Sequence, residues 1–346
     1  MNPKENFFQL YPDVIIKALE DAGFNPTGQC LQLNSLENRV YSLMLEDNSH
    51  VVMKFYRPGR WIIEQIQEEH DFINDLVLDE VPVCAPLTLA NNQTIMETEG
   101  MFYSVWQRTG GRIPEEFSEE MLMTIGRLIA RLHNNGAVKQ AKHRLKMTSE
   151  NFIIRPLKFL TDNNFIPKML VKEFEKYALD AAHALDESMK NVPVHRIHGD
   201  CHWGNLLHNG SNLFFLDFDD FVTGPAVQDI WMIAPAIDAR GIADREILIE
   251  GYRQFRDFET KWLHAVNPLK ASRYINYAAW IAKRIDDPTF KNAFPNFGTE
   301  EYWEKETSDL EHMIKEGFEP EYIRESENTP KEDHSKLTNK DYFFDM

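Results

Sequence analysis

The alternation of apolar and polar residues divides the chain into a strand-rich beginning and a longer helical part. Runs of strand-like composition with turn-like borders predict strands at residues 30–34, 39–45, 50–56, 81–83 and 95–107. The polar run Glu46-Asp47-Asn48-Ser49 separates the second run from the third and predicts a hairpin. A small β-rich lobe is therefore expected at the N-terminal end of the chain.

Helical periodicity marks most of the remaining sequence. Apolar residues recur at intervals of three and four, which predicts helices over residues 11–22, 61–78, 118–134 and 174–189, and an almost wholly helical chain after residue 229. Gly110-Gly111 is expected to be a pivot. We therefore predict an α+β fold of two lobes: a β-rich lobe with one principal helix over residues 1–108, and a mostly helical lobe over residues 109–324, with nucleotide chemistry in the cleft between them.

Composition bears on compartment and oligomeric state. The chain has 346 residues, of which 43% are hydrophobic and 27% charged, which is typical of a soluble globular protein. It has no apolar run of the roughly 18–20 residues that a membrane span requires, and its first residues do not resemble a secretory signal. Three cysteines are too few for a disulfide framework. We expect a cytoplasmic monomer without a membrane span.

The net charge of −18 argues against nucleic acid as a partner, because phosphate backbones repel an acidic surface. This charge is unevenly distributed. Residues 300–346 hold 15 Asp and Glu against 6 Lys and Arg, so 6 − 15 gives −9, half of the total. A solvated C-terminal extension explains this imbalance, and residues 325–346 are expected to form an acidic, flexible tail.

One short segment carries the clearest candidate chemistry. Asp200 and Asn205, in the run HGDCHWGN that starts at His198, have the D-x-x-x-x-N spacing of a kinase catalytic loop. In such a loop the Asp accepts the proton of the substrate hydroxyl, and the Asn amide oxygen holds Mg²⁺. Asp217 follows twelve positions after Asn205, where a second metal-binding carboxylate is expected. The segment predicts phosphoryl transfer.

Each of these residues also has an ordinary structural interpretation. Asp200 could bond its own loop and Asn205 could cap it, but the five-residue step between them and the presence of Asp217 favour catalysis. Asp217 follows an apolar run, which predicts a buried carboxylate at a strand end, with a cation as its partner. Asp219 or Asp220 could add a further contact at the metal or form a solvated pair.

A phosphate-binding lysine is expected in the β-rich lobe. Lys54 ends a strand-like run of the V-A-I-K type, although an exposed strand lysine is the common alternative. The predicted helix that follows offers Glu68 and Glu69 as ion-pair partners for the ammonium. We favour Glu69, and the alternative remains open.

The phosphate loop has no G-x-G-x-x-G pattern. Residues 33–39 bridge the first two predicted strands, where such a loop belongs, and offer Ser35, Asn38 and backbone amides to a phosphate. An ordinary polar turn is an equally good interpretation of this segment. Adenine is expected to meet the chain near residues 105–107.

A zinc site is a weaker interpretation of the same loop. His198, Cys201 and His202 are possible ligands, but Gly199 and Gly204 argue against the helix that would align the two histidines. A further ligand cluster at suitable spacing is lacking. His198 is expected instead to bond the backbone and brace the loop.

These motifs resemble the aminoglycoside phosphotransferase and choline kinase-like branch of the protein-kinase-like superfamily, and more closely still its bacterial stress response kinases. HGDCHWGN at 198–205 and LDFDD at 216–220 carry the resemblance. Supporting segments lie at residues 33–41, 54–58, 69–70, 224–229 and 287–288. Gly199 and Asp219 differ from the H-R-D and D-F-G motifs of eukaryotic protein kinases.

The resemblance implies a bilobal protein-kinase-like fold and an ATP- and Mg²⁺-dependent Ser/Thr protein kinase that phosphorylates itself and acts in stress responses. Carried over by position, Asp200 is the proton acceptor, Asn205 and Asp217 bind Mg²⁺, Asp217 is also an active-site residue, and Ser35 lies at the ATP site. We assign Lys54 and Glu69 to phosphate binding.

Two rival functions remain at this point. A small-molecule kinase acting on an amino alcohol or an aminoglycoside would carry the same catalytic loop. A catalytically inactive, nucleotide-sensing interaction protein is the rival from another class, although the presence of Lys54, Asp200, Asn205 and Asp217 argues against it. The expected partners are protein substrates with Ser or Thr acceptors, including the chain itself.

Overall fold

The computed structural model describes residues 7–8, 10–114, 117–210, 212–236 and 238–315. These residues form two compact units. The sheet unit contains residues up to Ile113, with Ala141–Arg144 and Leu206–Asp219. The helical unit contains Pro114–Gln140, Leu145–Asn205 and the chain from Asp220 onward. Each unit is described by itself.

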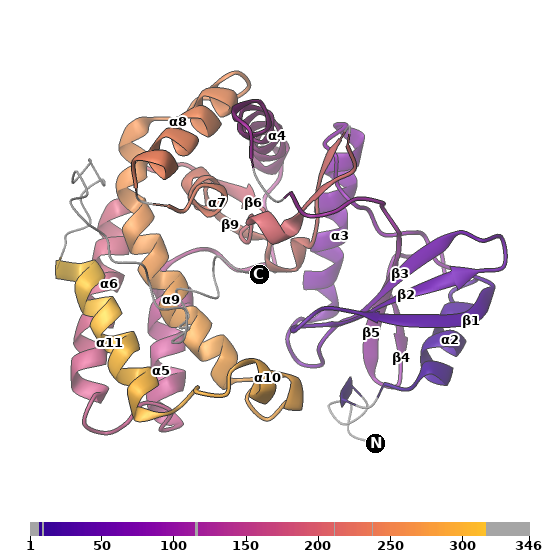
Figure 1. The fold of residues 1–346 in the computed structure, drawn as a ribbon, viewed down its shortest axis with the longest axis horizontal. Helices are drawn as coiled ribbons and strands as arrows, with labels where there is room; N and C mark the ends of the chain where they lie inside the picture. Colours follow the sequence, from indigo (N-terminus) through magenta and orange to yellow (C-terminus); the bar gives the residue numbers. More distant parts are fainter. Residues whose placement is uncertain (1–6, 9, 115–116, 211, 237, 316–346) are drawn as a thin grey trace. The chain divides into compact units, whose positions relative to one another are not determined.

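A five-stranded antiparallel sheet organises the sheet unit (Figure 1). Its strands, in spatial order, are β1 (Pro26–Leu33), β2 (Arg39–Leu45), β3 (His50–Phe55), β5 (Met101–Gln107) and β4 (Met96–Thr98). Helix α2 (Pro12–Asp21) buries Ile15 and Leu19 in the core that Met53 and Phe55 of β3 also join. Because successive strand residues point to opposite faces, Lys54 lies on the other face from this core.

Helix α3 (Ile63–Leu78) and a hairpin complete the sheet unit. The hairpin pairs β7 (Leu206–His208) with β8 (Leu213–Phe215). Backbone hydrogen bonds tie it to the rest of the unit, because Arg112 N donates to His208 O at 3.0 Å and Phe215 N to Pro82 O at 3.0 Å. The hairpin, and with it Asp217, thus belongs to the unit that holds Lys54.

Eight α-helices and a two-stranded sheet make up the described part of the helical unit. The helices are α4 (Glu119–Val138), α5 (Arg155–Asp162), which continues a π-helical turn at Glu150–Ile154, α6 (Val171–Ser188), α7 (Ala226–Ile233), α8 (Ala239–Arg253), α9 (Val266–Ala282) and α11 (Glu300–Lys315), with the short α10 (Pro288–Ala293) between the last two. Strands β6 (Val194–Ile197) and β9 (Val222–Pro225) pair antiparallel. Short 3-10 turns lie at Trp203–Asn205, Phe218–Asp220 and Thr260–Ala265.

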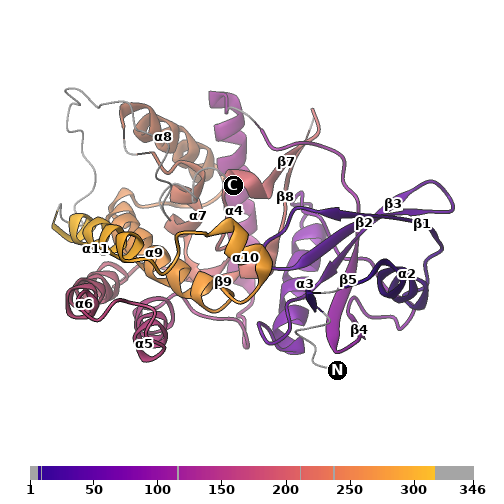
Figure 2. The same ribbon diagram turned by 60° about the horizontal axis from the view of Figure 1, so that its bottom comes forward.

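Helices α4 and α8 lie side by side within this unit (Figure 2). Two glycines allow the close approach. A Cβ on Gly126 would stand 2.0 Å from Leu248 O, and one on Gly251 would stand 2.2 Å from Met123 O. Each helix therefore places a glycine against a backbone carbonyl of the other, which no larger residue permits at this distance.

The predicted α+β class is confirmed, and most elements lie where the hydrophobic pattern places them. The predicted strand at 81–83 is wrong, because this segment makes only an isolated bridge between Val83 and Phe215. The lobe limits at residues 108 and 324 stay predictions, and the predicted tail at 325–346 lies outside the described residues. In the part of the chain that the structure describes, no helix is both long and apolar enough to cross a membrane.

Candidate active site

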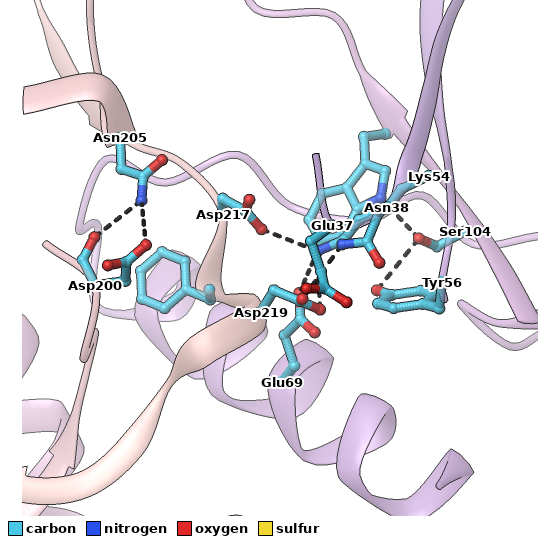
Figure 3. A network of polar contacts seen from close by, with 12 residues as sticks. Glu37, Asn38, Lys54, Tyr56, Glu69, Ser104, Asp200, Asn205, Asp217 and Asp219 are labelled. Atoms are coloured by element: carbon cyan, nitrogen blue, oxygen red, sulfur yellow. Dashed lines mark hydrogen bonds and ion pairs between the residues drawn. The ribbon is translucent and has the colours of Figure 1, made fainter. Parts of the chain in front are cut away.

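Lys54 stands among three carboxylates of the sheet unit (Figure 3). Its Nζ lies 3.2 Å from Glu69 Oε1, 3.0 Å from Asp217 Oδ1 and 3.3 Å from Asp219 Oδ1. The lysine itself is buried, and its ammonium also lies 4.9 Å from the centre of the Tyr56 ring. Strand β3, helix α3 and the chain after β8 therefore bring their charged groups together at one point.

The two neighbouring glutamates of α3 have different partners. Glu69 is fully buried and pairs with Lys54, as the sequence analysis favours. Glu68 instead accepts the backbone N–H groups of Lys142, His143 and Arg144, two of them at 2.9 Å. Adjacent helix positions point in directions about 100° apart, so only one of the two can face the lysine. Glu68 fastens the segment Ala141–Arg144 to the sheet unit.

Asp217 differs from its predicted environment. The sequence predicts a buried carboxylate, but the Asp217 side chain is 51% exposed, so this prediction is wrong. The backbone explains the difference. Asp217 has φ +55, a left-handed conformation that a non-glycine residue seldom adopts and that turns the chain sharply after β8. The Asp217 side chain therefore does not follow the apolar side chains of β8 into the interior, and its Oδ1 faces Lys54.

Asp219 is the buried acid of this segment, and the sequence analysis assigned it only a minor alternative role. Its Oδ2 accepts a hydrogen bond from Asn38 Nδ2 at 3.2 Å and pairs with Arg60 at 2.5 Å, while its Oδ1 faces Lys54. Arg144 donates to the Asp219 carbonyl and to Phe218 O. The signal in the sequence is an acid two positions after the predicted metal-binding Asp, but nothing there marks its basic partners.

The charges of this cluster shift one another's pKa values. Burial raises the pKa of Glu69 to about 7, although Lys54 opposes the shift. Burial alone would raise the pKa of Asp219 as well, but Arg60, Lys54 and Arg144 outweigh it and hold that pKa below the ordinary value. Burial would lower the pKa of Lys54, and the carboxylates, Asp217 foremost, raise it well above the ordinary value. The ammonium stays charged.

The loop between β1 and β2 lies beside this cluster in the sheet unit. Both ends of the Asn38 amide are in use, since Nδ2 donates to Asp219 and Oδ1 accepts Arg57 N at 3.2 Å. Glu37 pairs with Arg57 and with Arg60. Ser35 is half-buried in the same loop. Side-chain contacts thus fix the loop, while the proposed contact of Ser35 with ATP stays a prediction, as does the adenine site near residues 105–107.

The second group of candidate residues lies in the helical unit, on the loop after β6. Asn205 Nδ2 donates to the Asp200 backbone carbonyl at 2.9 Å and lies 3.4 Å from Asp200 Oδ2. The Asn205 amide oxygen is turned away from Asp200 (Figure 3). On the other side, Arg273 Nη2 lies 2.7 Å from Asp200 Oδ1. The Asp200 carboxylate is held between a loop amide and a guanidinium.

Asp229 of α7 anchors this loop through hydrogen bonds to its backbone. Its carboxylate accepts His198 N and Gly199 N, both at 2.9 Å, and its Oδ2 also meets His133 Nε2 at 2.9 Å. Gly199 has φ +82, and a Cβ there would stand 2.5 Å from Asp220 O. The glycine before Asp200 is therefore required both by its backbone angle and by the space beside it.

The histidines of the loop serve it through hydrogen bonds. His198 Nδ1 accepts Asp200 N at 3.3 Å, which confirms His198 as a backbone-bonding brace. His202 Nε2 lies 3.5 Å from Asp200 Oδ2. Within the described residues, no group of three or more His, Cys, Asp or Glu side chains is arranged to hold a metal ion.

Asp229 and Arg273 are the supporting residues of this loop that sequence reasoning missed. A buried acid inside the apolar helix Ala226–Ile233 is a signal that could have revealed Asp229, because such a carboxylate needs hydrogen-bond donors. Arg273 comes from α9, about seventy positions further along the chain, and its sequence surroundings give no sign of its partner. The structure thus joins Lys54, Glu69 and Asp217 in the sheet unit, and Asp200 and Asn205 in the helical unit.

A profile of the phosphotransferase enzyme family matches residues 30–264. The chain therefore belongs to the phosphotransferase enzyme family, and it is a kinase of that family. Among individual relatives, stress response kinase A of Escherichia coli K12 is 37% identical over 327 residues, covering 92% of this chain and 97% of the relative. The serine/threonine protein kinase RdoA of Salmonella typhimurium is 36% identical, covering 92% of this chain and 98% of the relative.

Solved structures share the fold at low sequence identity. Amicoumacin kinase hAmiN, in a complex with AMP-PNP, Ca²⁺ and Ami, has a TM-score of 0.70 at 17% identity and covers 89% of this chain and 95% of its own. A microcompartment-associated aminopropanol kinase has a TM-score of 0.67 at 16% identity and covers 88% of this chain and 98% of its own. Kinases of the phosphotransferase family use ATP as phosphoryl donor.

Proposed function

We propose that this kinase transfers phosphate from ATP to Ser or Thr hydroxyls of proteins, including its own chain, in a Mg²⁺-dependent reaction, and that it acts in a bacterial stress response. The relatives that cover almost the whole chain are named stress response kinase A and serine/threonine protein kinase, which supports the acceptor and the setting. The arrangement of Asp200 and Asn205 on one braced loop is the structural observation that carries the proposal.

Asp200 is the proposed proton acceptor. Its pKa would be raised by burial, but the charges of Arg273 and His202 outweigh burial and hold that pKa well below the ordinary value. Asp200 is thus ionised at neutral pH, and it is a weak base. Phosphoryl transfer asks mainly for a nucleophile aligned with the phosphate, so an acceptor that orients the hydroxyl suits the reaction better than a strong base would.

Asn205 and Asp217 are the proposed Mg²⁺ ligands. Their donor atoms fit the ion, because Mg²⁺ prefers carboxylate, carbonyl and water oxygens and is held in kinases by few protein ligands. The amide oxygen of Asn205 is turned away from Asp200, and the Asp217 carboxylate is half exposed, so both present oxygens outward within their own unit. Mg²⁺, when bound, neutralises charge on the phosphates.

Lys54 is the proposed phosphate-binding cation of the sheet unit. Glu69 fixes the ammonium from α3 at 3.2 Å, in the manner of the lysine–glutamate pair of protein kinases. The acidic neighbours, Asp217 foremost, raise the pKa of Lys54 well above its ordinary value, so the side chain is charged at neutral pH. A permanent cation on a central strand is suited to bind phosphate oxygens.

The test is transfer of labelled γ-phosphate in the presence of Mg²⁺, with the chain itself and a generic protein as acceptors. Asp200→Asn should lower kcat by about 10²–10⁴, the range for the loss of a positioned acid–base group. Asp217→Ala should also lower transfer strongly, because it removes a proposed ligand of Mg²⁺. Asp257→Asn, an exposed acid in the turn after α8, is the matched control and should transfer at the wild-type rate. Full activity of either active-site variant would remove the assigned role.

Analysis of the labelled products identifies the acceptor. Acid hydrolysis of the labelled protein should yield phosphoserine or phosphothreonine. A parallel panel of amino alcohols and aminoglycosides should remain unlabelled. Turnover of one such compound without any labelling of protein would replace the protein kinase with a small-molecule kinase, the activity named for several structural neighbours. ATP binding without transfer to any acceptor would instead indicate a nucleotide-sensing protein.

A further inference from the structure

Arg273 gives the proposed proton acceptor a fixed positive neighbour. Its Nη2 lies 2.7 Å from Asp200 Oδ1, and its side chain is only 23% exposed. The other carboxylate oxygen faces the loop, with His202 Nε2 at 3.5 Å and Asn205 Nδ2 at 3.4 Å. Nothing in the proton-transfer step requires an arginine at this place, because a hydroxyl needs only a carboxylate oxygen to accept its proton.

Further positive charge lies on the same side of the helical unit. Lys270 precedes Arg273 by three positions on α9, so the two side chains share one face of the helix. Lys270 Nζ lies 3.5 Å from Pro235 O, just after α7, and 5.9 Å from the centre of the Trp231 ring. Arg245 binds the neighbouring carbonyls of Ala234 and Ala236. Arg273 thus lies directly at Asp200, and Lys270 lies one helical turn from Arg273 on α9.

These contacts change the electrostatics that an acceptor meets. A lone Asp200 carboxylate would attract a cationic alcohol, because its charge would act at short range in a partly buried site. Arg273 offsets that charge at 2.7 Å, and Lys270 adds a second cation one helical turn away on α9. An acceptor hydroxyl must come within about 3 Å of Asp200, so its neighbouring groups come within range of both cations.

We propose that Arg273 determines which acceptors the kinase takes, favouring a hydroxyl flanked by acidic groups and disfavouring cationic alcohols such as amino alcohols and aminoglycosides. This inference rests on the proposed function, because it assumes that the acceptor hydroxyl meets Asp200. It names the substrate class, which is a Ser or Thr in an acidic peptide segment. Arg273 is a specificity-determining residue in this proposal, and the proton still passes from the hydroxyl to Asp200.

The sequence of this chain supplies a matched probe. Ser326 stands between Glu325 and Glu327. A peptide of residues 321–331 with Thr329→Ala keeps Ser326 as its one Ser or Thr acceptor. The comparison peptide carries Glu325→Lys and Glu327→Lys in addition, so that the two probes differ only in the charge beside the hydroxyl.

Wild-type enzyme should phosphorylate the acidic peptide with a kcat/KM about tenfold or more above that of the basic one, because nearby unit charges in a partly screened site interact by roughly 1 kcal/mol or more. Arg273→Gln should bring the ratio close to one, Arg273→Lys should keep most of it, and Arg273→Glu should invert it. Arg155→Gln removes an exposed arginine that pairs only with Glu150 on the surface, and should leave the ratio unchanged. A merely structural arginine would lower both rates equally and preserve the ratio.

A binding measurement separates this inference from the proposed function. Fluorescence anisotropy with both peptides carrying Ser326→Ala reports the charge preference without any transfer. If wild-type enzyme labels no protein or peptide, the protein kinase assignment fails, while tighter binding of the acidic peptide that depends on Arg273 still supports the inference. Equal binding and equal turnover of the two peptides by wild-type enzyme, or a preference that survives Arg273→Gln, would overturn it.

Discussion

A single buried ammonium lies among three carboxylates in the sheet unit. Lys54 lies 3.0–3.3 Å from one oxygen each of Asp217, Asp219 and Glu69. Because these acids outnumber the lysine, Arg60 and Arg144 are needed beside Asp219 to complete the charge balance. The cluster therefore consists of one half-exposed acid, Asp217, and two buried acids, Glu69 and Asp219, around one lysine.

Adjacent glutamates of α3 should have separable roles. Glu69→Gln removes the buried charge that fixes Lys54, so kcat/KM for ATP should fall tenfold or more, because the cation loses its position. Glu68→Gln instead weakens three backbone hydrogen bonds to a carboxylate, so the free energy of unfolding should fall by about 1–3 kcal/mol. Steady-state kinetics and urea unfolding of both variants test these two expectations. Similar kinetic losses in the two would contradict the assignment of Glu69 alone to Lys54.

Asp219 should matter for stability more than its neighbours do. Asp219→Asn leaves Arg60, Lys54 and Arg144 with one counterion fewer in a buried place, which should cost about 3–5 kcal/mol of unfolding free energy. Its folded pKa is lowered, so the stabilising contribution is present above the unfolded pKa of about 4 and is lost as the pH falls below it. Asp71→Asn, an exposed acid on the same α3, should change stability by less than about 0.5 kcal/mol.

At the scale of elements, the catalytic loop depends on one glycine. Gly199→Ala forces a Cβ to within 2.5 Å of Asp220 O at φ +82, so the helical unit should lose about 2–4 kcal/mol and Asp200 should leave its place. Gly210→Ala is the control, since its φ is +91 but a Cβ there meets nothing within 4 Å. That variant should lose only about 1 kcal/mol and keep its activity. Thermal unfolding and phosphate transfer measure both, and equal losses would show that backbone angle alone matters.

Much of the element layout follows from sequence because its causes are local. The hairpin from Arg39 to Phe55 has a polar turn between apolar runs, and α4 begins at the helix-capping Ser118. The segment 81–83 shows the limit of that reasoning. Its composition suits a strand, but among the described residues it forms an isolated bridge, between Val83 and Phe215, and no strand. Spacing made Asp200 and Asn205 candidates, and the structure places them on one loop. The partners of Asp219 and Arg273 come from distant parts of the chain, and no local pattern announces such contacts.

At the scale of the whole molecule, the candidate chemistry is divided between two compact units. The chain leaves the helical unit after Asn205 and returns to it at Asp220. The short excursion between them carries the β7–β8 hairpin and Asp217, which are fastened to the sheet unit through Arg112 and Pro82. Asp217 is therefore positioned by the same unit as Lys54, although it is a near neighbour of Asn205 in sequence.

Acidification should change the free energy of unfolding through two buried groups whose pKa values are shifted in opposite directions. Burial lowers the pKa of His195 in the helical unit to about 3, so between pH 6.5 and 3 the unfolded chain takes up a proton there that the folded chain does not. The free energy of unfolding should fall by up to about 1.4 kcal/mol per pH unit on acidification through that window. Glu69 acts in the opposite sense, since its folded pKa of about 7 makes the folded chain bind the extra proton between pH 7 and 4.5.

Two substitutions therefore should change the pH dependence in opposite directions. His195→Gln removes a group whose protonation favours unfolding, so stability should fall less steeply between pH 6.5 and 4.5. Glu69→Gln removes a group whose protonation favours the folded state, so stability should fall more steeply over the same range. Urea unfolding at half-unit pH intervals, with wild type beside both variants, gives the slopes. If both substitutions changed the slope in the same direction, at least one of these two buried side chains would not have the protonation state that its surroundings impose.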